Sequence, residues 1–131
     1  MSKAMNTRRA YHMVSISWHF GYWTPNKGRT RAEVRRLVDR VWANEAPHRR
    51  KPDLVFLGPG STAYYMTVKH YIALSDGHLC YDTVLHELAH ALGHYTHGPG
   101  FIKCWIRLLA KYARCDELLL LTYAKLIGYK L

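Results

Sequence analysis

A His-Glu-x-x-His pattern inside an apolar stretch is the feature that most constrains how this chain can fold. His86 and His90 are four residues apart, so on a helix their imidazoles share one face and can reach a single cation. Glu87 is turned about 100° from His86 around that helix, where a carboxylate meets a metal-bound water rather than the metal. The surrounding residues from Val84 to Leu92 are mostly apolar, which predicts a buried helix. Because buried imidazoles and carboxylates need partners, this pattern favours a metal site over a purely structural helix.

Zinc is the metal that fits these ligands. It takes tetrahedral nitrogen ligands, and a catalytic zinc keeps three protein ligands and leaves the fourth position to water. Zinc lowers the pKa of that water to about 7, and Glu87 is then placed to act as general base. Two histidines are candidates for the third ligand. His94 lies four residues after His90, but Gly93 predicts that the helix is ending there. His97 begins a His-Gly-Pro segment, and a turn at that segment can return it to the metal.

The segment His97-Gly98-Pro99-Gly100-Phe101 completes a second motif. Together the two motifs resemble those of the SprT-like (Spartan-type) metalloproteases, in which an HExxH helix is followed by a His-Gly-Pro-x-Phe segment. The resemblance implies that His86, His90 and His97 hold one catalytic zinc ion, with Glu87 as general base in peptide-bond hydrolysis. It also implies that an edge strand beside the metal receives an extended protein or peptide substrate, for which Tyr71 to Ser75 is the candidate. The gap between the motifs is short for that family, and Gly100 stands where a glutamate is frequent.

The rest of the chain predicts a single α+β domain over residues 1–131. Thr30 and Glu33 form a capping box that announces a first helix. Alternating or apolar runs bounded by turn residues predict a small sheet of three or four strands. With the resemblance, this is a zincin-like minimal metalloprotease core with an N-terminal helix, an active-site helix and two C-terminal helices. The expected helices are 31–44, 83–94 (with Asp82 as N-cap), 99–114 and 117–127 (with Asp116 as N-cap and Gly128 ending it), and the expected strands are 11–18, 53–57, 62–68 and 71–75.

The net charge of +10 is concentrated in the first part of the chain. Residues 1–9 are expected to form a flexible basic arm. Such a one-sided balance is typical of nucleic-acid binders, although an ordinary solvated face explains much of it equally well. DNA is therefore a second expected partner, consistent with the resemblance to proteases that act on DNA-associated proteins. The candidate phosphate contacts are Arg36 and Arg40 on the first helix and Arg49, Arg50 and Lys51 in the loop after it.

The composition bounds the remaining possibilities. Three cysteines without CxxC spacing predict buried thiols in a reducing compartment rather than a disulfide framework. The absence of a long apolar run or an apolar N-terminal core predicts no membrane partner and an intracellular, cytoplasmic protein, in the host cytoplasm if it is viral. Two other functions stay open: a zinc hydrolase of a small amide or peptide that ignores DNA, and a non-catalytic, zinc-stabilised nucleic-acid-binding module. The sequence leaves the oligomeric state open.

Overall fold

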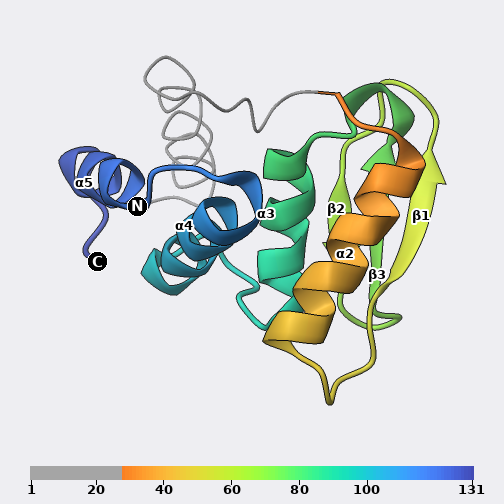
Figure 1. Cartoon of the computed structure of the whole chain (residues 1–131), viewed down its shortest axis with the longest axis horizontal. Helices are drawn as coiled ribbons and strands as arrows, with labels where there is room; N and C mark the ends of the chain where they lie inside the picture. Colours follow the sequence, from red (N-terminus) through yellow and green to blue (C-terminus); the bar gives the residue numbers. More distant parts are fainter. Residues whose placement is uncertain (1–27) are drawn as a thin grey trace. The chain divides into compact units, whose positions relative to one another are not determined.

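The computed structural model of this chain describes residues 28–131 (Figure 1). The strand expected at 11–18 and the arm expected at 1–9 lie outside the described residues. The described part is α+β, as predicted, and it divides into two compact units, residues 28–93 and residues 94–131. The elements are the helices α2 (Arg31–Glu45), α3 (Tyr81–Ala91), α4 (Pro99–Ala113) and α5 (Glu117–Leu126), the strands β1 (Asp53–Leu57), β2 (Tyr64–Met66) and β3 (Tyr71–Ser75), and the short 3-10 helix η1 (Asp76–His78).

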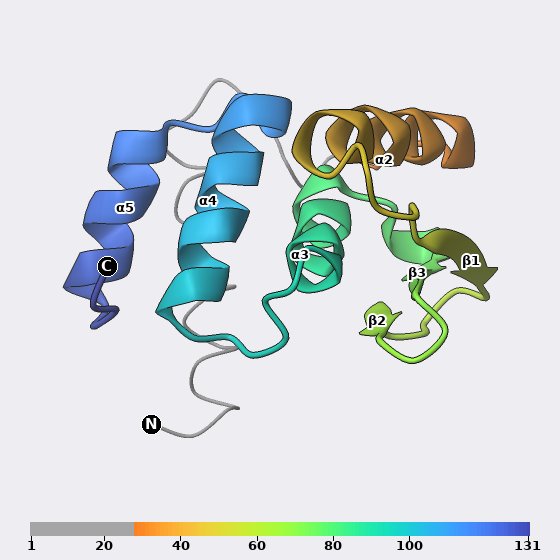
Figure 2. The ribbon, with the colours of Figure 1, turned by 90° about the horizontal axis from the view of Figure 1, so that it is seen from below.

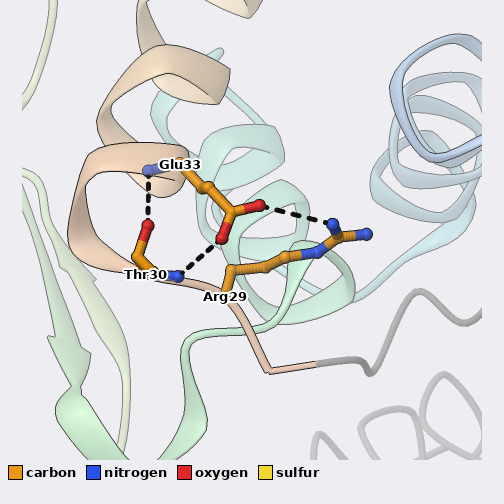
Figure 3. Close-up of polar contacts among 3 residues, drawn as sticks. All are labelled: Arg29, Thr30 and Glu33. Carbon is orange, nitrogen blue, oxygen red and sulfur yellow. Dashed lines mark hydrogen bonds and ion pairs between the residues drawn. The ribbon is translucent and has the colours of Figure 1, made fainter.

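Helix α2 begins at the capping box that the sequence predicts. The Thr30 hydroxyl accepts a hydrogen bond from the Glu33 backbone N–H at 3.1 Å, and the Glu33 carboxylate accepts one from the Thr30 backbone N–H at 3.0 Å (Figure 3). Arg29 adds an ion pair to the second carboxylate oxygen of Glu33 at 3.5 Å. The hydrogen bond from the Thr30 N–H is the main reason that the pKa of Glu33 is lowered from its ordinary value. The backbone donors of the N-cap residue and of the first helical turn are thereby satisfied locally, which fixes where α2 starts.

The sheet of the first unit has the order β1-β3-β2, with β3 in the middle. Strand β3 runs parallel to β1, pairing Leu54 with Ile72, and antiparallel to β2, pairing Tyr65 with Ile72. Alternate residues point to opposite faces, and the more buried set of Leu54, Tyr65 and Ile72 lies on one of them. Both α2 and α3 lie on one side of this sheet (Figure 2). Helix α3 contacts α2, β2 and β3, so the core of this unit forms where the two helices meet the sheet.

The strand order corrects the expected position of the substrate strand. The resemblance makes Tyr71 to Ser75 the edge strand, but β3 is central and hydrogen-bonded on both sides. Its backbone donors and acceptors are used within the sheet, because β3 pairs with parallel β1 on one side and with antiparallel β2 on the other. Among the described strands the edges are β1 and β2, and of these two β2 contacts α3 closely. The expectation for Tyr71 to Ser75 is therefore wrong.

The second unit, residues 94–131, is built on two helices that pack side by side (Figures 1 and 2). Pro99 occupies the first turn of α4, and Arg114 ends that helix in the left-handed conformation at φ 58°. Asp116 caps α5 by accepting a hydrogen bond from the Leu119 backbone N–H at 2.9 Å. These ends agree closely with the sequence prediction, as does the buried stripe of α4: Phe101, Ile102, Trp105, Ile106 and Leu109. No helix in residues 28–131 combines the length and the apolar character that crossing a membrane demands.

We expect Thr30→Ala to lower the free energy of unfolding by about 1 kcal/mol, because it leaves a first-turn N–H of α2 without its cap. Urea unfolding followed by circular dichroism measures the change. Thr67→Ala, at an exposed threonine in the turn between β2 and β3, is the matched control and should stay within about 0.5 kcal/mol of the wild type. Equal effects of the two substitutions would show that the capping box does not stabilise α2.

Candidate metal centre

Helix α3 begins and ends differently from the sequence prediction. Cys80, not Asp82, is its N-cap, because residue 80 is held extended at φ −118° and ψ 147° by a bridge to Gly28. Asp82 instead lies in the first helical turn, where its carboxylate accepts a hydrogen bond from the Thr83 N–H at 2.8 Å. Burial raises the pKa of Asp82 to about 6. The predicted N-cap is therefore wrong, although an acidic residue near the positive end of a helix is still electrostatically favourable.

The C-terminal end of α3 lies at Ala91, three residues before the predicted end at His94. Leu92 closes the helix, and Gly93 turns the chain away at φ 115°, a left-handed conformation that favours glycine. His94 therefore does not continue the helical face of His86 and His90. Its ring lies against Gly100 instead, with Nδ1 3.4 Å from the position that a Cβ atom would take there. His94 also lines a cavity of about 490 Å³ at α4 and α5, together with Lys103 and Glu117.

The two histidines of α3 lie on one face of the helix, as their spacing predicts. Their ring centroids are 4.9 Å apart, and the ring planes are inclined at 79°. His86 is only 3% exposed. Its neighbours Val84 and Leu85 are completely buried, which fixes this part of the helix against the core. The positions of both imidazoles thus follow from the packing of α3.

His97 lies on the segment that leads into α4, and Phe101 packs against it. The ring centroids of His97 and Phe101 are 4.9 Å apart at an interplanar angle of 80°, and Phe101 is 1% exposed. This edge-to-face contact is a favourable aromatic geometry that limits rotation of the imidazole. The Phe of the His-Gly-Pro-x-Phe segment therefore has a physical role: it holds the histidine that comes four residues before it.

His86, His90 and His97 form a group that can hold a metal ion. Each offers one ring nitrogen, and these three atoms all lie within 4.8 Å of one another. Tetrahedral zinc ligands at bond lengths of about 2.0–2.1 Å lie about 3.3–3.4 Å apart, so modest side-chain rotations would bring the three nitrogens to coordination distance. Imidazole is a favoured zinc ligand, and the donor set therefore fits this ion. Other first-row metals also accept imidazole ligands, so the group by itself does not select zinc.

Glu87 is the ionisable residue next to the first ligand in the sequence, and it is 4% exposed. Burial raises the pKa of its carboxyl to about 7, which is near the range that suits a general base at neutral pH. A cation held by the adjacent histidines would stabilise the carboxylate and lower this pKa. The arrangement therefore offers three imidazoles for a metal ion and one carboxylate able to exchange a proton.

The five residues predicted to contact nucleic acid differ in their surroundings. Arg36 and Arg40 lie exposed on α2, as expected. In the following loop, Arg50 donates to the Lys69 carbonyl at 3.1 Å and pairs with Asp53 at 3.5 Å. The Arg50 carbonyl accepts a hydrogen bond from His70 Nε2 at 2.6 Å. Lys51, in the same loop, pairs with Asp39. Arg49 donates hydrogen bonds to carbonyls at the end of α3.

Apart from the ion pair of Arg50 with nearby Asp53, these intramolecular contacts could not be predicted from the sequence, because each joins the loop to a residue 12 or more positions away. The role of Arg49 at α3 was likewise missed, since nothing in a run of basic residues indicates which carbonyl they will meet. Nucleic-acid binding by the five residues stays a prediction. Comparisons of this chain with protein-family models, with curated proteins and with solved structures find no match.

Two histidine substitutions test the ligand set. We expect His97→Ala to weaken zinc binding by more than about 100-fold, because even changes to groups that only support a ligand cost 10–100-fold. His94→Ala should stay within about threefold of the wild type, since His94 lies against Gly100. Zinc dissociation constants are measured by competition with a chelating indicator. A larger loss in His94→Ala than in His97→Ala would assign the third position to His94.

The raised pKa of Glu87 also predicts how the stability of the metal-free protein depends on pH. Its pKa is raised on folding, so its contribution to stability is fully present below about pH 4.5 and is lost as the pH rises through about 7. Glu87→Gln removes this titration and should gain about 2–3 kcal/mol relative to the wild type between pH 5 and pH 8. Urea unfolding at both pH values, in the presence of a chelator, gives the difference. Glu117→Gln, at an exposed glutamate, serves as control, and a flat Glu87→Gln difference would contradict the prediction.

Proposed function

We propose that this chain is a zinc-dependent peptidase of the SprT-like kind, the family that its two motifs resemble. The observation that carries the proposal is the group formed by His86, His90 and His97, with the buried Glu87 next to the first of them. Three protein ligands are typical of catalytic zinc sites, whereas structural sites have four. The third histidine of the group is the one that the resemblance names.

In this proposal each side chain has a defined task. The three histidines hold the zinc ion, which would supply Lewis-acid activation of a water molecule and of the peptide carbonyl. Glu87 takes a proton from the attacking water and passes it to the leaving amine, a role that requires a carboxyl pKa below or near the working pH. Phe101 keeps the His97 ring in place. The apolar packing of α3 limits access of bulk water to Glu87, which strengthens its electrostatic interactions.

An extended peptide is the substrate that suits the sheet. Strand β2 is an edge among the described strands, and it contacts α3, which carries two of the ligands. A substrate segment adding to such an edge is held by its backbone, so the side-chain preference of the enzyme would be weak. Tyr64 and Met66 of β2 are 39% and 36% exposed and are available to contact substrate side chains.

DNA association is a second candidate function, and one observation favours it. Lys103, Arg107 and Lys111 lie exposed along α4 at intervals of four residues, and the exposed Arg114 follows as the C-cap of the helix. A row of cations on one helix face can follow a phosphate backbone, and a bound nucleic acid would then deliver proteins to the active site. Binding that depends on phosphate contacts should weaken steeply as the salt concentration rises, whereas recognition of a neutral peptide should not.

The decisive experiment incubates zinc-loaded protein with casein and with a DNA-bound basic protein, each with and without single-stranded DNA. We expect cleavage of both proteins, and a loss of at least about 100-fold in rate for Glu87→Gln, the usual contribution of a general base. The variant must first be shown to bind zinc as well as the wild type does, so that a lost proton transfer is not confused with a lost metal.

The outcomes separate the candidate functions. Cleavage that needs both Glu87 and DNA would establish a DNA-directed protease. Cleavage that ignores DNA would keep the peptidase and discard the nucleic-acid role. If zinc-loaded wild type cuts neither protein, the general peptidase is excluded, and a narrow hydrolase of small amides or a zinc-stabilised binding module takes its place.

A further inference from the structure

The C-terminal end of α3 lies next to the metal ligands and is sharply defined. Ala91 follows His90 directly, and the Gly93 N–H donates to the His90 carbonyl at 3.0 Å. The last carbonyls of a helix have no partner within the helix and need donors from elsewhere. How this end is held therefore affects both the position of His90 and the direction in which the chain leaves toward His97.

Arg49 supplies donors at this end, from a loop more than forty residues earlier in the sequence. Its Nη2 donates to the Ala91 carbonyl at 3.3 Å, and its Nη1 donates to the Leu92 carbonyl at 3.5 Å. A guanidinium group is planar and carries several N–H donors, so one side chain can serve two neighbouring carbonyls. Its positive charge also interacts favourably with the negative end of the helix dipole.

Arg49 is itself held in place by α2. The Trp42 indole Nε1–H donates to the Arg49 carbonyl at 2.8 Å, and the Arg49 N–H donates to the Ala46 carbonyl at 3.1 Å. The guanidinium carbon lies 5.6 Å from the centroid of the Trp42 ring. Because Trp42 is only 3% exposed, this chain of contacts connects the core of α2 to the end of α3.

We propose that Arg49 is a positioning residue of the metal centre. By fixing the end of α3, which lies between His90 and His97 in the sequence, Arg49 sets the metal affinity. Arg49 contacts Ala91, which directly follows His90, and Leu92, which lies five residues before His97. Without these contacts the turn at Leu92 and Gly93 is free to shift, and the three imidazoles meet less often in the geometry that a metal ion needs. The proposal rests on the metal site used in the proposed function, but not on peptide hydrolysis.

Zinc affinity tests this role in the full chain. We expect Arg49→Gln to raise the zinc dissociation constant about 10-fold, at the lower end of the 10–100-fold range for groups that orient metal ligands. Arg49→Lys keeps the charge and one donor group, and it should fall between Arg49→Gln and the wild type. Cobalt(II) in place of zinc gives a second readout, since a disturbed ligand set changes the visible absorption that reports tetrahedral coordination.

Arg36→Gln is the matched control, because it removes the same charge from an exposed arginine on α2. Loss of a positive charge alone should slightly favour cation binding, so a weaker site in Arg49→Gln cannot arise from net charge. Equal zinc dissociation constants for Arg49→Gln and Arg36→Gln would overturn the proposal. It would also be overturned if Arg49→Gln only lowered the free energy of unfolding of the metal-free protein and left the zinc affinity unchanged.

A second variant covers the case in which Arg49→Gln does not fold without metal. Trp42→Phe keeps an aromatic ring but removes the N–H that holds the Arg49 carbonyl. We expect a zinc dissociation constant about threefold above that of the wild type, since the support of Arg49 is only weakened. An unchanged constant in Trp42→Phe would then count against the proposal. Because metal affinity is measured without a substrate, failure here is distinct from a failure of the peptidase assay.

Discussion

Burial of ionisable side chains within an apolar helix is the constraint on which this structure depends. Val84, Leu85, Leu88 and Ala89 are completely buried, and the same helix carries His86 at 3% and Glu87 at 4% exposure. A buried carboxylate is costly, and the raised pKa of Glu87 expresses that cost. A cation bound by the neighbouring imidazoles would offset it. Burial of Glu87 is therefore a cost that a bound cation would reduce, which supports the proposed metal site.

The rest of the first unit serves to hold this helix. The capping box fixes the start of α2, whose apolar stripe is buried, and α2 contacts α3 directly. Strand β3 uses both of its edges within the sheet, which leaves β2 as the edge strand that contacts α3. In the proposed peptidase an extended substrate would add to an edge strand, so the strand order decides which segment is available beside α3. Sheet topology and proposed chemistry are thus linked through the contacts of α3.

Local signals in the sequence were enough to predict most elements. The Thr30 and Glu33 capping box, Pro99 at the start of α4 and Gly128 after α5 each act on neighbouring residues, and the helices they delimit end within a few residues of the prediction. The predictions failed where distant segments compete with local signals. The start of α3 is set by the pairing of residue 80 with Gly28, and β3 is central because β1 pairs with it across a gap that includes β2. No local pattern encodes either pairing.

The same distinction applies to the basic residues. A run of cations in the sequence predicts a surface for polyanions, but a cation contributes to such a surface only if its charge still faces solvent. The loop from Arg49 to Lys51 directs its side chains to an ion pair, a carbonyl of the β2–β3 turn and the end of α3. These contacts attach the loop to neighbouring elements of the protein. The side chains of Arg50 and Lys51 are nevertheless 60% and 49% exposed, so they stay candidates for phosphate contacts beside the exposed cations of α2 and α4. Arg49 differs from them because its guanidinium group meets the carbonyls at the end of α3.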